Sequence, residues 1–242
     1  MVNKLILLGL ITLGVSSCKH EIDLSGFPHP EVEPPVVVPC PDSLVDIDGN
    51  VYDVIDVDGT CWIASNLKVT RFTNGDSIPL ETEGSSWIQL NTPAQCYYDN
   101  DSVNLNVYGR LYNGYSVVDS RGLCPTGWHV PTEAEVLLLV NYAGGSCCAG
   151  GVLKSTSTQP TQGGWAVPNS FASDGFDFSA LPGGLRRPWG DYELVYQYGI
   201  WWTATSISTT YAKASSMSYI NGGVNFSDNE RNAGYSVRCI KD

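Results

Sequence analysis

The sequence contains few basic residues for its length. Its 242 residues include 13 lysines and arginines against 25 aspartates and glutamates, which gives a net charge of −12. A surface of that sign repels phosphate backbones, so we do not expect a nucleic-acid partner. The sequence also lacks a phosphate-binding glycine loop with its lysine, so it offers no nucleotide site of that type.

Motifs typical of enzymes are missing as well. We find no nucleophile elbow, no HExxH helix and no convincing pair of carboxylates. Only three histidines are present, and no CxxC or histidine-rich spacing indicates zinc. His129 is a candidate base, but a histidine next to a tryptophan before a helix is more often structural. The sequence therefore favours a protein that is not an enzyme and needs no cofactor.

A hydrophobic run that could span a bilayer comfortably in the mature protein is also missing. The run LILLGLITLGV (5–15) is short for a transmembrane helix and is typical of a signal peptide. It is followed by VSSC (15–18), which resembles a bacterial lipobox. We expect residues 1–17 to be a lipoprotein signal peptide and Cys18 to be the lipidated first residue of the mature chain. An ordinary secretory peptide that is cut nearby is the alternative.

The segment after the signal peptide, residues 18–40, is acidic, rich in proline and free of helical periodicity. We interpret it as the lipidated N-terminus and an extended tether, which holds a domain at 41–242 away from a membrane. KHEID (19–23) looks like the charged export signal of Bacteroidota surface lipoproteins. The expected location is therefore the outer membrane, with a lipid anchor and the domain facing the cell exterior.

Seven cysteines follow the lipidation site, so at least one is free or bonded to another chain. Outside the cytoplasm, disulfides are the expected state. Cys61 could pair with Cys96 or with Cys40, and the sequence does not decide between them. The adjacent cysteines at 147–148 lie in a glycine-rich loop. They could form a vicinal disulfide, pair with other cysteines or stay reduced.

One stretch, GLCPTGWHVPTEAEVLLLVNYAGG (122–145), carries strong helix signals. Thr132 is a candidate N-cap, and Glu135 completes a capping box with it. The glycine pair at 144–145 can take the left-handed conformation that ends a helix. We predict a helix over 133–143. Its apolar face is expected to comprise Val136, Leu137, Leu139 and Val140.

Most of the remaining chain has the pattern of short strands and turns. Residues 45–69 contain two Asp-Gly turns around a β-branched run, which predicts a β-meander. Segments 198–206, 212–220 and 233–242 are predicted to be three antiparallel strands. Since the helix needs a sheet against which to bury its face, the expected fold class is α+β, with long loops.

An acidic loop is expected at 95–119, between two aromatic clusters. Asp99, Asn100 and Asp101 could direct several oxygens at a calcium ion. The spacing is not that of an EF-hand, and Asx side chains commonly brace a turn instead. Calcium is therefore a possible but unrequired ligand.

A second group of candidate binding residues lies further along the chain. Their aromatic rings could stack on the apolar C–H faces of sugars; they are Trp189, Tyr192, Tyr196, Trp201 and Trp202. The alternative for Trp201 and Trp202 is that they are core residues of a strand.

Several blocks of the chain resemble the Fibrobacter succinogenes major paralogous domain family. The blocks are DIDGNVYDVI, CWIASNLK, PAQCYYDND, YGRLYNGYSV, CPTGWHVPTEAEV, AGGVLKS, FSALPGGLR, WWTATS and YSVRCIKD. They cover residues 45–242 in the family's order. The resemblance implies a C-type-lectin-like fold in a secreted or surface protein and says little about activity. The chain departs from the family at IAS (63–65) and at the cysteine pair (147–148).

The resemblance has three further implications. In lectin-like folds a cysteine near a helix commonly bonds to the terminal strand, which implies a disulfide between Cys124 and Cys239. Calcium-dependent lectins of this fold use Glu-Pro-Asn or Gln-Pro-Asp, whereas this chain has Val-Pro-Asn at 167–169, so sugar binding through calcium is not expected. Formylglycine-generating enzymes share a related fold and use cysteines with copper, which the pair at 147–148 could suggest. The rest of the active-site sequence of those enzymes is not recognisable here, so an oxidase of that type is the least favoured function.

These observations together favour a cell-surface lipoprotein that acts as a non-enzymatic binding or adhesion module. Its partners would be the membrane, through the lipid anchor, and a glycan or protein ligand. The alternative is an accessory or structural subunit of an outer-membrane assembly, such as a nutrient-import complex or a fimbrial tip.

Overall fold

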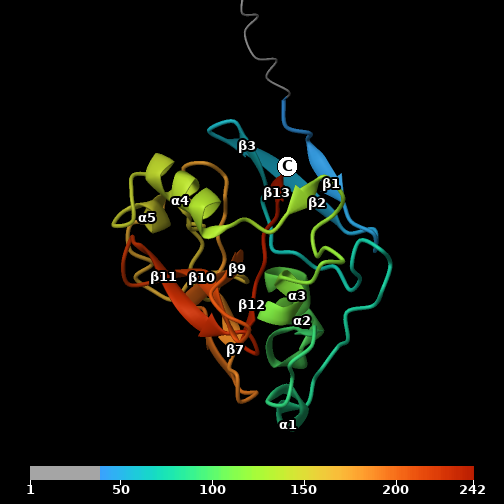
Figure 1. Ribbon diagram of the computed structural model, residues 1–242. Coiled ribbons are helices and arrows are strands. Elements are labelled where there is room, and N and C mark those ends of the chain that lie inside the picture. The colour runs from blue at the N-terminus through green and yellow to red at the C-terminus, as the bar shows by residue number, and fades with distance from the viewer. Residues whose placement is uncertain (1–38) are drawn as a thin grey trace, which may run out of the picture. The chain divides into compact units, whose positions relative to one another are not determined.

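Three small antiparallel sheets form the frame of residues 39–242, the part of the chain that the computed structural model describes (Figure 1). The predicted signal peptide, Cys18 and most of the tether lie outside the described residues. Within 39–242, no helix has the length and apolar character needed to cross a membrane.

The first sheet contains the predicted β-meander. Its strands β1 (Ser43–Val45), β2 (Val51–Val57) and β3 (Thr60–Ile63) are consecutive and antiparallel. Gly49 and Gly59 have left-handed φ angles at the two tight turns, as the Asp-Gly signals indicate. The sheet continues through β13 (Ile240–Lys241) to β6 (Trp128–His129).

The second sheet has the order β11-β10-β9. Strands β9 (Tyr198–Ser206) and β10 (Tyr211–Ser218) confirm two of the three predicted strands, and the third strand is β11 (Val224–Glu230). The prediction of a single strand over 233–242 was wrong. The segment breaks because Ser236 exchanges backbone hydrogen bonds with β9, donating to Ile200 and accepting from Trp202.

The end of the chain therefore joins all three sheets. Before the break, β12 (Gly234–Tyr235) pairs in the third sheet, whose order is β4-β5-β12-β7-β8. After it, β13 pairs in the first sheet. The remaining strands of the third sheet are β4 (Gln95–Cys96), β5 (Leu111–Asn113), β7 (Gly183–Arg186) and β8 (Tyr192–Val195).

The predicted main helix is α4 (Glu133–Tyr142), and both hydrogen bonds of the Thr132–Glu135 capping box are formed. Val136, Leu139 and Val140 are buried, whereas Leu137 is 37% exposed. The prediction that Leu137 belongs to the apolar face was wrong. At about 100° per residue, Leu139, Val136 and Val140 fall on one side of the helix, and Leu137 lies beyond the edge of that side.

The other helices are short and lie where loops were expected. They are α1 (Gly84–Trp87), α2 (Ser102–Tyr108), α3 (Gly114–Val117) and α5 (Ala149–Leu153), together with a 3₁₀ turn, η1 (Tyr98–Asn100). The acidic loop predicted at 95–119 thus contains α2. That helix begins there because the side chain of Asp101 accepts a hydrogen bond from the amide of Val103. The α+β class is confirmed.

Two disulfides hold the described part of the chain together. Cys124 bonds to Cys239, as the resemblance implied, and Cys40 bonds to Cys61. The candidate pair Cys61–Cys96 is not formed. Cys96 is completely buried in a different hydrophobic cluster, around Trp87 and Leu111, whereas Cys61 packs in the cluster between the first sheet and β9.

Three buried cations fix the loops around the sheets. Lys154 is fully buried, and its Nζ donates to the carbonyl oxygens of Ser170, Ser218 and Asn221 at 2.9–3.0 Å. Burial lowers the pKa of Lys154 to about 8, while the three acceptors favour the charged ammonium. Arg238 and Arg186 likewise donate to backbone carbonyl oxygens of loops that are distant in sequence. Backbone oxygens, rather than carboxylates, satisfy these charges.

Candidate functional site

Trp201 and Trp202, two of the predicted ligand-binding residues, are core residues. Their exposed fractions are 6% and 1%. Adjacent strand residues point to opposite faces, and both faces of β9 are covered: Trp201 packs in the cluster under α4, and Trp202 lies against Tyr235 on the other side. Both indole N–H groups are satisfied internally, by the side chain of Asn66 and the carbonyl of Tyr112. The prediction that these two rings bind a ligand is therefore wrong.

The remaining aromatic candidates gather around β8. The two surfaces that the sequence singled out meet here, because η1 packs against β7 and β8. The hydroxyl of Tyr192 donates to Oδ1 of Asn100 at 3.0 Å, and the rings of Tyr98 and Tyr192 lie 5.4 Å apart. Trp189 lies in the turn before β8, Tyr192 begins the strand and Tyr196 follows its last residue. We call this stretch along β8 the aromatic end of the domain.

Arg186 holds this end in shape. The guanidinium is fully buried between the rings of Trp87 and Tyr192, with centroid distances of 4.3 and 4.9 Å. It donates to the carbonyl oxygens of Glu81 and Thr82 in one loop and of Gly190 in another. The two loops are thereby joined through one side chain.

The turn between β7 and β8 presents Trp189 to solvent. Gly190 has φ +101°, and an added Cβ would lie 2.6 Å from Cα of Gly84. Only glycine lets the turn approach α1 so closely. Trp189 is 53% exposed, and the guanidinium of Arg187 lies 5.3 Å from its ring centroid. Arg187 also forms an ion pair with Glu193 at 2.6 Å. A large exposed ring thus stands beside a fixed pair of charged groups.

The candidate calcium ligands have other partners. Asp101 caps α2, and Asn100 accepts from Tyr192 and donates to the carbonyl of Thr82. Asp99 and Asn100 both have left-handed φ angles, which suit Asx residues in a tight turn. Between residues 39 and 242, no group of three or more His, Cys, Asp or Glu side chains is placed to hold a metal. These residues brace the turn below the aromatic end.

The free thiols lie in two different settings. Burial raises the pKa of Cys96 to about 11, although Arg186 and Tyr192 act in the opposite direction. Burial and the neighbouring Cys96 raise the pKa of Tyr192. The exposed sulfurs of Cys147 and Cys148 lie 2.7 Å apart, and this contact raises the pKa of Cys148. Cys96 and Cys148 are therefore protonated at neutral pH.

His129, the candidate base, is held between two carboxylates. Nδ1 lies 2.6 Å from Oδ1 of Asp242, and Nε2 lies 3.1 Å from Oε1 of Glu135. Partial burial opposes protonation, but the two carboxylates outweigh it and raise the pKa of His129. The imidazole thus links β6, α4 and the chain end.

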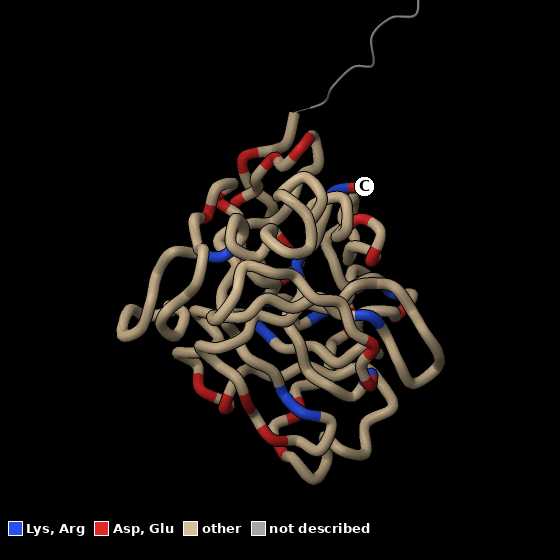
Figure 2. The backbone as a smooth tube through the Cα atoms, turned by 90° about the vertical axis from the view of Figure 1, so that its left-hand side faces the viewer, with Lys and Arg blue, Asp and Glu red and all other residues tan. Residues whose placement is uncertain are grey.

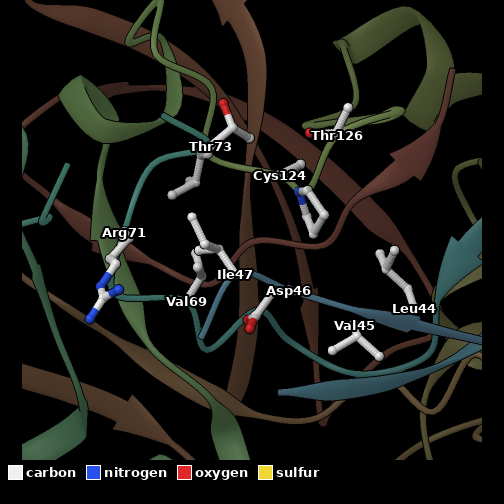
Figure 3. A pocket seen from close by; sticks show the side chains of 11 residues that line it. Leu44, Val45, Asp46, Ile47, Val69, Arg71, Thr73, Cys124 and Thr126 are labelled. Carbon is white, nitrogen blue, oxygen red and sulfur yellow. The ribbon is translucent and has the colours of Figure 1, made fainter. Parts of the chain in front are cut away.

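A hollow of about 300 Å³ lies beside β1, far in sequence from the aromatic residues. Figure 3 shows Thr73, Cys124 and Thr126 on one side of it and Val45 and Ile47 on the other. Its buried acid, Asp46, accepts hydrogen bonds from Tyr52 and Asn50 and so braces the turn after β1. We do not place a ligand there.

Sequence reasoning missed a group of carboxamides beside Tyr196. Asn104, Gln159 and Gln162 line a hollow of about 210 Å³ with this tyrosine. They come from α2 and from the segment 158–163, which no local pattern connects. The one local signal is the high aromatic content near residue 196, which indicated Tyr196 but not its neighbours.

The fold and the site define an α+β domain of antiparallel sheets, which is cross-linked by two disulfides and has an exposed aromatic end. The chain belongs to the Fibrobacter succinogenes major domain family, which matches residues 55–241. The match begins within β2, whereas the compact unit of the structure also includes β1 and the Cys40–Cys61 disulfide. No curated protein and no solved structure matches the chain.

Proposed function

We propose that this protein is a cell-surface lipoprotein whose folded domain binds a glycan or protein ligand without chemical turnover. The lipobox-like VSSC (15–18) supports anchoring through Cys18, and residues 18–40 would then act as the tether to the outer membrane. The disulfides support an extracytoplasmic location.

The observation that carries the binding proposal is Trp189. A tryptophan that is 53% exposed offers a large apolar face, and its turn is fixed by Gly190 and by the buried Arg186. Such rings are the typical anchors of recognition surfaces, because they bury much area and lose little conformational freedom. The Arg187–Glu193 pair next to it supplies hydrogen-bonding groups at the rim.

The thiols and the histidine support binding rather than catalysis. The protonated thiols of Cys96 and Cys148 are poor nucleophiles, because the thiolate is the reactive form. His129 already has a carboxylate on each ring nitrogen. We therefore propose no enzymatic activity, and an oxidase of the formylglycine-generating type is the least favoured function.

We also propose that the fold is a variant of the C-type-lectin-like fold. The support is a single main helix, several short antiparallel strands and the Cys124–Cys239 disulfide to the chain end. An experimental structure whose topology differs from lectin-like domains would overturn this assignment.

The binding proposal is tested with the purified full-length protein on a glycan array and in pull-downs from surface extracts. Trp189→Ala is expected to weaken binding of whatever ligand is found by at least about tenfold, or about 1.4 kcal/mol. The control is Tyr142→Ala, which removes another aromatic residue that is 51% exposed, on α4. Equal binding by the Trp189 variant, or measurable turnover of a ligand, would count against the proposal.

The anchoring proposal is tested by intact mass. Protein extracted from membranes is expected to begin at Cys18 and to carry acyl chains, and Cys18→Ser is expected to remain in the soluble fraction. An unmodified N-terminus in membrane-extracted protein would contradict the anchor.

A second candidate function is a subunit of an outer-membrane assembly, such as a nutrient-import complex or a fimbrial tip. In the described part of the chain, β11 has β10 as its one strand partner, and the amide of Val224 at its start donates to the carbonyl of Ser146. The rest of this edge has no strand partner there, which suits pairing with a strand from another protein. Purification under native conditions separates the two candidates: stoichiometric partners favour a subunit, and a lone monomer favours a binding module.

A further inference from the structure

The hollow beside Tyr196 is lined entirely by uncharged groups. Its volume of about 210 Å³ is below the range of about 300–1,000 Å³ that is typical of pockets for drug-sized ligands. The size therefore suits one ring or a similar small unit. The residues that line it include Val103, Asn104, Val107, Gln159, Gln162 and Tyr196.

Three carboxamides supply both donors and acceptors to this hollow. Nε2 of Gln159 donates to the carbonyl of Gly164 at 2.8 Å, and Nδ2 of Asn104 donates to that of Tyr98 at 3.2 Å. Gln159 Nε2 also donates to the carbonyl of Thr161 at 3.4 Å, so both of its N–H groups are used, whereas Asn104 keeps one N–H group. The amide oxygens of both side chains remain as acceptors. The exposed Gln162 has no side-chain partner within residues 39–242, so it can donate and accept. Hydroxyl groups, which do both, are matched partners for such a set.

The hollow is held in place before any ligand arrives. Tyr196 has φ +69°, a conformation that is costly for a bulky residue. Its amide donates to the carbonyl of Pro182 at 2.9 Å, and its carbonyl accepts from Ala166 at 2.7 Å. These two bonds fix the backbone and keep the ring at the surface, 40% exposed. The 158–163 segment is closed by two backbone hydrogen bonds: the amide of Gln159 donates to the carbonyl of Trp165, and the amide of Trp165 donates to the carbonyl of Ser157.

The charge of the molecule restricts the ligand. None of the residues that line the hollow is ionisable at neutral pH, so no cation is present to receive an anion. The surrounding chain carries a net charge of −12, which repels acidic ligands. The apolar side chains of Val103, Val107 and Pro160, together with the Tyr196 ring, suit the C–H face of a ring rather than a fully polar ligand.

We infer that this hollow binds a single uncharged sugar unit, which stacks on Tyr196 and donates and accepts hydrogen bonds with Asn104, Gln159 and Gln162. This inference rests on the proposed binding function and specifies a ligand class for its aromatic end. Acidic sugars, such as uronic acids or sulfated units, are excluded by the charge argument.

The test uses the full-length protein and matched pairs of methyl glycosides, each a neutral hexoside and its uronic acid counterpart. Ligand-observed NMR is expected to show binding of at least one neutral hexoside. The affinity for its uronic acid counterpart is expected to be lower by at least about tenfold. Gln162→Glu, which keeps the shape of the side chain and adds a negative charge, is expected to lower the affinity for the neutral sugar by about tenfold.

Tyr196→Gly is the most informative variant, because glycine accepts the left-handed φ and removes only the ring. It is expected to lose at least tenfold in affinity, while Tyr196→Phe keeps the ring and stays within about threefold of the parent protein. Asn225→Ala, on an exposed position of β11, is the matched control and should change nothing. Thermal unfolding of each variant checks that the fold is intact.

Two results would overturn the inference. One is neutral-sugar binding that Tyr196→Gly and Gln162→Glu leave unchanged, which would place the sugar elsewhere. The other is the absence of any neutral-sugar binding. If a ligand then still depends on Trp189, the proposed binding function survives and only the sugar assignment fails.

Discussion

Lys154 shows how much a single residue can contribute to this fold. Its ammonium is the sole donor in the side chain, and it reaches the carbonyl oxygen of Ser170 in one loop, of Ser218 at the end of β10 and of Asn221 in the turn that follows β10. A buried polar group without a partner costs about 1–3 kcal/mol. The stability of these loops therefore depends on one side chain that the sequence alone does not distinguish from a surface lysine.

Replacing Lys154 is expected to destabilise the folded protein strongly. Lys154→Met keeps most of the side-chain volume but removes the buried donor of three carbonyl oxygens, of which the one on Ser218 is buried and the other two are partly buried. We therefore expect it to lower the free energy of unfolding by about 2–4 kcal/mol. Denaturant unfolding measures the change. Lys68→Met, at a half-exposed position, is the control and should cost less than about 0.5 kcal/mol. A stability of Lys154→Met close to that of the parent protein would show that the carbonyls find other donors.

For single residues, the sequence predicted those contacts whose two partners are close together in the chain. The Thr132–Glu135 capping box was predictable because both partners lie within one helical turn. The burial of Trp201 and Trp202 was not, since it depends on two clusters that cover opposite faces of β9. The carboxamides beside Tyr196 were missed for the same reason, because they meet only in the folded chain.

At the scale of elements, His129 connects β6, the start of α4 and the chain end through Glu135 and Asp242. Its pKa is raised in the folded state, so the protonated form is bound more tightly there than in the unfolded chain. The stabilisation is fully present below the unfolded pKa of about 6.5 and is lost as the pH rises through the higher folded value.

The parent protein is therefore expected to lose stability relative to a His129→Gln variant as the pH rises above about 6.5. The measurement is the free energy of unfolding of both proteins across this range, with the disulfides intact. Parallel curves for the two proteins would mean that the imidazole titrates alike in the folded and unfolded states.

Elements were predicted well where their signals are local. The helix at 133–142 and the β1–β2–β3 meander follow from caps, periodicity and Asp-Gly turns. The segment 233–242 was misread because its β-like composition does not reveal that its two halves pair in different sheets. Likewise, α2 depends on a cap at Asp101 inside a loop-like sequence.

At the scale of the whole molecule, the two disulfides span very different lengths of chain. Cys124 and Cys239 are 115 residues apart, whereas Cys40 and Cys61 are 21 apart. The first ties the final strand to the segment before β6, and the second ties the start of the domain to β3. The longer loop restricts the unfolded chain more.

Removing the disulfide that closes the longer loop is expected to cost more stability than removing the other. In the loop-entropy description, the double variant Cys124→Ala/Cys239→Ala should lose about 4–5 kcal/mol of stability and Cys40→Ala/Cys61→Ala about 3 kcal/mol. Unfolding by denaturant under non-reducing conditions compares them. A larger loss for the Cys40–Cys61 pair would show that native-state packing, rather than chain entropy, decides their contribution.

Acidic residues are spread over the described domain (Figure 2). Figure 2 shows acidic positions near the start of the described chain, where the hairpins of the first sheet carry the exposed Asp48, Asp53 and Asp58. The sequence predicted the overall acidity, because net charge is additive. It could not predict that the hollow beside Tyr196 would be free of charge, because that depends on which segments meet.

The described chain begins and ends at the same pole, beside β1 and β13, while α1 lies at the opposite pole (Figure 1). The turn that carries Trp189 packs against α1 through Gly190. A fluorophore, affinity tag or sensor chip coupled beyond Asp242 would consequently sit far from that indole. Immobilised protein can then be screened against ligand libraries with its recognition face unobstructed.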